Sequence, residues 1–299
     1  MSEDKQDKKV AGGPPWKKGG RGWKHKIQED GDDLSKLQHQ VDESLPCVKV
    51  FRKFQEELDA KHDKYENLVK SSRDLTIESK RIIFLLHRIT GCKEETTEKL
   101  LSEASIKIKE LQSGNLRKIA EQLQDEDIFY YLRSISPGLQ EYVEAVSFYH
   151  YLKDNRLVGF EELQADLVFH EENDTSSKED SLLSKQVLVP LPPQDYMLGI
   201  ADLTGELMRK CINSVGQGNL EEPFQLCHFI QNIYDAFLSF GNTPGREFTR
   251  KIQTLRQSLK KVENACYTIR VRGSEIPKHM LIHVFNEEIS ENLECDLTV

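Results

Sequence analysis

A helical repeat of positions over about forty residues constrains the fold of this chain more than any other feature. From Phe51 to Ile89, one set of positions recurs in alternating steps of three and four, which is the spacing of one face of an α-helix. These positions are Phe54, Leu58, Lys61, Tyr65, Leu68, Ser72, Leu75, Ser79, Ile82, Leu86 and Ile89. Pro46 precedes the run and Gly91 ends it. The pattern predicts a single helix of about 40 residues, or ~60 Å.

The same spacing predicts helices over most of the remaining chain. A second long stripe begins at Phe248 and stops at Gly273, with Pro277 beyond it. Shorter helices are expected near 94–124, 126–154, 160–168, 194–215 and 221–240. No segment alternates convincingly as a strand. We therefore predict an all-α fold, a bundle of seven helices in which two very long helices form the spine.

Composition shifts divide the chain into a helical domain and polar tails. Residues 8–26 hold seven Lys or Arg and no acid, so we expect 1–46 to be a disordered basic tail. Its two basic clusters could serve nuclear import, tether nucleic acid, or simply be solvated. We expect 47–285 to form one helical domain interrupted by a flexible loop at 170–190, and 286–299 to be a C-terminal tail.

Charge and cysteine usage exclude several classes of protein. A net charge of −9 argues against a surface that is basic everywhere, so nucleic-acid binding would need a local basic patch. No apolar run approaches the ~20 residues of a membrane span, and no apolar signal region stands near the N-terminus. The six cysteines lack CxxC pairing and are expected to be reduced thiols. We expect a cytoplasmic and nuclear protein without a membrane partner.

The stretch "GLQEYVEAVSFYHYL" (138–152) places two carboxylates in an apolar helix. Glu141 and Glu144 lie one turn apart on the face that carries Ala145 and Phe148, while the opposite face is also apolar. A helix that is apolar on two sides is largely buried, and an unpartnered ionised carboxylate there is costly. Either this face reaches water, or a positive group lies against it.

A second acidic pair lies in "DYMLGIADLTGELMRKCINSVG" (195–216). Asp202 and Glu206 share a side of the predicted helix with Gly199 and Gly205, which suggests close approach of another backbone or a ligand. Four carboxylates from two facing helices would suit Mg²⁺, or Mn²⁺, better than zinc. The pattern lacks the Glu-x-x-His of di-iron bundles. A solvated acidic stripe remains the alternative.

These stretches, with "FQEELDAKHDKYENLVKSSRDLTIESKRIIFLLHRIT" and "LKKVENACYTIRVRGSEIPKHML", resemble the Trax family of the translin superfamily, from about Phe51 to Leu281. The resemblance implies a seven-helix translin-type fold and a hetero-oligomer with translin, expected to be octameric. It implies that the chain is the Mg²⁺-dependent endoribonuclease subunit, which cleaves single-stranded RNA and promotes RNA silencing by degrading the nicked passenger strand of siRNA. The family's catalytic acids fall on Glu141, Glu144, Asp202 and Glu206, both as metal ligands and as catalytic residues.

Basic side chains on the first three predicted helices are candidates for sequence-independent contacts with RNA phosphates. They are Lys80, Arg81, His87, Arg88, Arg117, Lys118 and Arg133. Two other functions stay open: a non-catalytic adaptor that stabilises translin and assists nucleic-acid binding, and a di-iron carboxylate protein. Loss of nuclease activity on Glu141→Ala with assembly intact would separate the enzyme from the adaptor.

Overall fold

The computed structural model describes residues 45–124, 126–170, 186–241 and 245–272 of the 299-residue chain. It comprises two units, Met1–Lys61 and His62–Val299. The predicted tails at 1–46 and 286–299 fall almost wholly outside the described residues, and the boundaries predicted for the domain remain predictions. No helix in the described ranges is long and apolar enough to cross a membrane.

The helical architecture predicted from the sequence is confirmed. The described elements, in chain order, are α2 (Pro46–His87), α3 (Glu94–Leu111), the π-helical segment η2 (Gln112–Leu116), α4 (Arg117–Leu123), α5 (Ile128–Asp154), α6 (Phe160–Ala165), β1 (Val168–His170), β2 (Gln186–Leu188), α7 (Pro193–Gly216), α8 (Glu222–Ser239) and α9 (Arg246–Arg272). Segments α3, η2 and α4 follow one another without a break in the range that was predicted as one helix. When they are counted as one, the described residues form seven helices. The longest is α2, with 42 residues.

Helix α2 begins at a proline, which fits the first helical turn because its missing N–H has no partner there anyway. In the first unit, residues 45–61 form the start of this helix, and Val50, Phe51, Phe54 and Leu58 are exposed. In the second unit, the predicted stripe is buried from Leu68 onward. The apolar repeat therefore identified the helix correctly, and in the second unit its stripe is buried.

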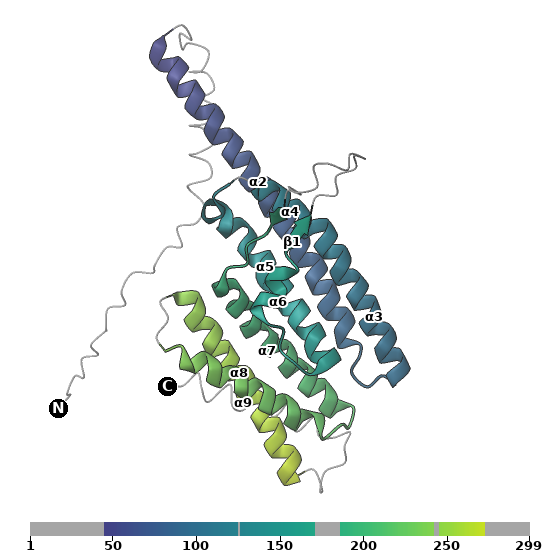
Figure 1. Ribbon diagram of the computed structural model, residues 1–299. Helices are drawn as coiled ribbons and strands as arrows, with labels where there is room; N and C mark the ends of the chain where they lie inside the picture. Colours follow the sequence, from purple (N-terminus) through teal and green to yellow (C-terminus); the bar gives the residue numbers. More distant parts are fainter. Residues whose placement is uncertain (1–44, 125, 171–185, 242–244, 273–299) are drawn as a thin grey trace, which may run out of the picture. The chain divides into compact units, whose positions relative to one another are not determined.

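The second unit is built around α5, whose side chains from Leu139 to Tyr149 are almost all buried. Helix α7 packs against α5 and also against α9, and α8 packs against both α7 and α9 (Figure 1). The α2 side of α5 is anchored near Pro137, where Ser72 Oγ accepts a hydrogen bond from Gly138 N and donates one to Ile135 O. This anchor lies one helical turn before Glu141.

Two short strands correct the expectation that the chain has none. β1 and β2 pair antiparallel, with Phe169 opposite Val187. The predicted helix at 160–168 ends at Ala165, and the predicted loop at 170–190 is a strand over Gln186–Leu188, while 171–185 lie outside the described residues. Strands of three residues are too short to show alternation, and their position depends on tertiary burial of Val187.

Candidate functional site

The two acidic pairs predicted from helical spacing lie on the two helices that pack most closely in the second unit, α5 and α7. Glu144 is buried, with 8% of its surface exposed, and Glu141 lies nearer the edge, with 23% of its side chain exposed. The prediction that this face of α5 is largely covered is therefore correct.

Gly199 explains how α7 comes so near to α5. A Cβ atom at this position would lie 2.7 Å from Val143 Cβ and 2.8 Å from Gln140 O, so only glycine permits this separation of the two helices. Asp202 follows less than one turn later. Gly205, in contrast, has open space where its Cβ would be, so the predicted close approach of a backbone is found at Gly199 and not at Gly205.

The other three carboxylates lie close enough to Glu144 to affect its pKa. That pKa is raised to about 9, first by burial and then by the negative charges of Asp202, Glu141 and Glu206. Within the described ranges, Glu144 has no hydrogen bond or ion pair of its own. At neutral pH it is therefore held as the neutral acid, which is how the fold accommodates four acids in one place.

Cationic side chains from three helices pair with the other three carboxylates. Lys80 of α2 lies 3.1 Å from Glu141 Oε1, and this contact raises the pKa of the lysine. Lys251 of α9 donates to both carboxylate oxygens of Asp202. Positive side chains of the chain itself therefore lie against Glu141 and Asp202.

Glu206 has two neighbours that carry nitrogen donors, His87 and Arg209. His87 Nε2 is hydrogen-bonded to Glu206 Oε2, and Arg209 Nη1 lies 3.7 Å from the same oxygen. The hydrogen bond from His87 is the main cause of the lowered pKa of Glu206. The histidine ring packs against Phe148 at a centroid distance of 4.9 Å, which holds the ring in place.

The donor set of this cluster fits a hard divalent cation. Its four groups offer only carboxylate oxygens, which are the ligands that Mg²⁺ and Mn²⁺ accept. Such a cation would offset the repulsion among the acids, which adds to the effect of burial in raising the pKa of Glu144. No three His, Cys, Asp or Glu side chains in the described ranges already stand in a coordinating arrangement. Cation binding at this site would therefore require the side chains, and the internal cations that pair with them, to rearrange.

The residues predicted to contact RNA separate into two groups. Lys80 and His87 belong to the carboxylate cluster, where they pair with Glu141 and Glu206. The others make no hydrogen bond or ion pair with the four carboxylates in the described part of the chain. Among these, Arg88, Lys118 and Arg133 are exposed, and Arg117 pairs with Glu121 on its own helix.

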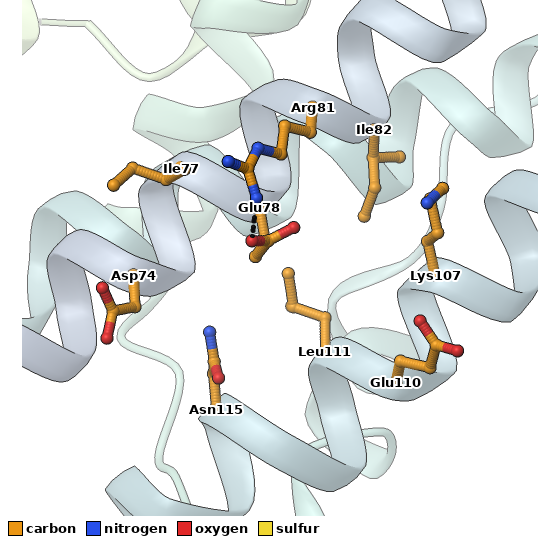
Figure 2. Close-up of a pocket in the computed structure, with 9 residues that line it drawn as sticks. All are labelled: Asp74, Ile77, Glu78, Arg81, Ile82, Lys107, Glu110, Leu111 and Asn115. Atoms are coloured by element: carbon orange, nitrogen blue, oxygen red, sulfur yellow. Dashed lines mark hydrogen bonds and ion pairs between the residues drawn. The ribbon is translucent and has the colours of Figure 1, made fainter.

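Arg81 lies in a separate groove of about 500 Å³ between α2 and the segment formed by α3 and η2 (Figure 2). There it pairs with Glu78 at 2.6 Å. The groove is lined by both acids and bases, including Asp74, Glu110 and Lys107. Its mixed charge gives no preference for phosphates, and none of the four clustered carboxylates lines it.

Lys251 and Arg209 are site residues that the sequence reasoning did not single out. Lys251 lies between Phe248, which is buried, and Ile252, which packs on the core, so the helical stripe of α9 already brought this lysine close to a buried face. The stripe does not say which helix that face contacts. The pairing of α9 with α7 was the missing information.

The chain was compared with protein-family models, curated proteins and solved structures. The model of the Translin family matches residues 63–273. Translin-associated protein X of Pongo abelii is 47% identical over 270 residues, covering 88% of this chain and 89% of that protein, and the Mus musculus protein is 48% identical with the same coverage. The Translin-associated protein X homolog of Schizosaccharomyces pombe is 27% identical over 228 residues, covering 75% of this chain and 89% of that protein.

Among solved structures, the crystal structure of apo-NeC3PO matches with a TM-score of 0.54 at 22% identity, covering 74% of this chain and 95% of that one. This likeness supports the fold. The family model and the mammalian relatives cover most of the chain, at identities far above those of unrelated proteins. The chain belongs to the Translin family.

Proposed function

We propose that this chain is the catalytic subunit of a hetero-oligomer with translin, and that it is an Mg²⁺-dependent endoribonuclease that cleaves single-stranded RNA. Its role would be to promote RNA silencing by degrading the nicked passenger strand. The observation that carries the proposal is that Asp202, Glu141 and Glu206 lie near enough to the buried Glu144 for their charges to raise its pKa, on two helices that pack together. Partnership with translin is supported by the names of the relatives, which describe proteins associated with translin.

The four carboxylates would hold the cation, with Mn²⁺ as a substitute for Mg²⁺. When bound, such an ion lowers the pKa of water and neutralises charge on the phosphate. The chain's own residues orient the site: His87 holds one oxygen of Glu206, and its ring is fixed against Phe148. Lys80 is more than half exposed beside Glu141, which suits it to contact an RNA phosphate. The expected products carry a 5′-phosphate and a 3′-hydroxyl.

A non-catalytic adaptor is the second candidate function. The observation that favours it is that three of the four carboxylates already have cationic partners within the chain. A purely structural cluster of charges would show the same pairing. Under this alternative, the chain would stabilise translin and assist nucleic-acid binding without cleaving RNA.

The experiment is co-expression of the full chain with translin, followed by cleavage of a labelled single-stranded RNA with Mg²⁺ or with EDTA. We expect cleavage only with Mg²⁺, and its loss on Glu141→Ala while the complex still elutes at the same size. Glu98→Ala, which removes an exposed carboxylate on α3, is the matched control and should cleave at the wild-type rate. Equal cleavage by Glu141→Ala and wild type would support the adaptor.

We also propose a cytoplasmic and nuclear location, from the basic clusters Lys17-Lys18 and Lys24–Lys26. Imaging of variants with alanine in these clusters tests it.

A further inference from the structure

Lys251 holds its carboxylate differently from the other cations of the cluster. Its ammonium donates to both oxygens of Asp202, so neither oxygen of that side chain is left without a donor. Lys80 comes closest to Oε1 of Glu141, and His87 and Arg209 both come closest to Oε2 of Glu206. Within the described ranges, Asp202 is the one member of the four whose two oxygens both accept a hydrogen bond from a side chain.

An ammonium group is a donor only, and it carries the same sign of charge as a metal ion. Each carboxylate oxygen has two lone pairs, so Lys251 does not block coordination by itself, but its charge repels a divalent cation over the few ångströms that separate them. A cation that takes Asp202 as a ligand must therefore overcome this repulsion or displace Lys251, whereas no hydrogen bonds in the described ranges hold both oxygens of Glu141 or of Glu206.

From this geometry we infer that Lys251 is an internal counterion of the carboxylate cluster, which competes with the divalent cation for Asp202 and thereby sets the metal affinity of the site. This inference rests on the proposed function, because it assumes that Asp202 is a metal ligand. It makes Lys251 a positioning residue for the proposed reaction, acting through Asp202.

The position of Lys251 allows it to leave. Its side chain is 27% exposed, on a flexible four-carbon stem near the start of α9. Glu247, one turn earlier on the same helix, is exposed and stands at the spacing that suits a Glu–Lys pair. Withdrawal of the ammonium from Asp202 thus needs only a change of side-chain rotamer, with no movement of α9.

Two substitutions of Lys251 should shift metal affinity in opposite directions. Lys251→Gln removes the competing charge, so we expect the site to bind Mn²⁺ about tenfold more tightly than wild type. Lys251→Arg keeps the charge and can grip both carboxylate oxygens with its planar fork, so it should bind Mn²⁺ more weakly. A lysine with a merely structural role would weaken binding in both variants.

The measurement is Mn²⁺ titration by electron paramagnetic resonance, on the full chain co-expressed with translin. Asp202→Asn provides the baseline for Mn²⁺ bound elsewhere, and Arg250→Gln removes a neighbouring exposed cation from the same turn of α9. Melting in EDTA provides a second readout: Lys251→Gln should melt below wild type, since the acids then lose a counterion, and should regain the difference in millimolar Mn²⁺.

The outcomes separate this inference from the proposed function. If wild type shows Asp202-dependent Mn²⁺ binding and Lys251→Gln binds no more tightly, the inference is overturned and the metal site stands. If wild type shows no binding that depends on Asp202, the metal-dependent function fails together with the inference. A gain in Lys251→Gln with no change in Arg250→Gln supports the competition.

Discussion

At the scale of single residues, Glu144 is the group that most clearly reflects the cost of gathering four acids. It is 8% exposed, and no hydrogen bond or ion pair holds it in the described part of the chain. The fold keeps it neutral by raising its pKa to about 9, first through burial and then through its acidic neighbours. A residue kept protonated at such a cost is typical of functional sites.

Glu144→Gln should stabilise the complex in EDTA, because the amide keeps the shape of the acid and needs no proton. The unfolded chain ionises Glu144 from about pH 4.5 upward, while the folded chain keeps the proton up to about pH 9. Wild type therefore loses stability as the pH rises through this window, and its deficit relative to the glutamine variant grows. Thermal unfolding of both proteins at pH 5, 7 and 9 checks this. Each kcal/mol of difference in the free energy of unfolding should shift Tm by about 2–4 °C.

The same variant should lose nearly all Mg²⁺-dependent cleavage and gain less from Mg²⁺ in melting than wild type does. The reason is that a cation stabilises only the folded state that binds it. A variant that melts below wild type in EDTA, with a full gain from Mg²⁺, would make Glu144 a structural residue.

Two buried serines of α2 allow a second prediction at this scale. Ser72 Oγ exchanges hydrogen bonds with the backbone of α5 at Gly138 and Ile135, whereas Ser79 Oγ is buried without a partner in the described structure. Ser72→Ala should cost about 1–3 kcal/mol, because it removes two buried hydrogen bonds between α2 and α5. Ser79→Ala, the matched control, should be neutral or stabilising. Urea unfolding measures both, and equal losses would contradict the assigned roles.

At the scale of elements, the packing of α7 on α5 decides whether the acids meet. Gly199→Ala would place its Cβ within 2.8 Å of the α5 backbone at Gln140, so the helices must separate. We expect a loss of about 1–3 kcal/mol of stability, as for other overpacked contacts. Circular dichroism during thermal unfolding checks this.

Gly205→Ala on the same helix is the comparison for that prediction. Its Cβ meets open space, and alanine is a better helix former than glycine, so stability should rise by up to about 1 kcal/mol. A loss in Gly205→Ala as large as in Gly199→Ala would show that contact with α5 does not account for the cost of Gly199→Ala.

At the scale of the whole molecule, the first unit carries exposed apolar side chains on its helix. Phe51 is 72% exposed, and Val50, Phe54 and Leu58 are exposed on the same helix. Apolar stripes of this kind mark interfaces with partners. Because the chain belongs to the Translin family, we expect its partner to be a second helical subunit.

We expect the chain to be poorly soluble when expressed alone and to be rescued by co-expressed translin. Replacing Phe54 and Leu58 with serine should raise the solubility of the chain alone and reduce its co-purification with translin. Replacing Lys53 and Glu56 with serine, in the same stretch of α2, is the matched control and should change neither. A wild-type chain that sediments as a monomer at tens of micromolar would contradict the prediction.

The features that depend on neighbours within a few residues of the chain could be predicted from the sequence. Helical spacing predicted seven helices, their approximate limits, and the placing of Glu141 with Glu144 and of Asp202 with Glu206 on single faces. Periodicity and helix-ending residues are local, so they can be read without the fold. The two short strands escaped this reading, because three residues carry too little pattern.

Which side chains lie against the four clustered carboxylates could be learned only from the tertiary structure. His87 is bonded to Glu206, and Lys251 reaches Asp202 from a helix nearly fifty positions further along the chain. The raised pKa of Glu144 likewise needs α5 and α7 to be in contact. Each of these depends on contacts between segments far apart in the chain, where burial and charge act through space, and no local pattern encodes which helix meets which.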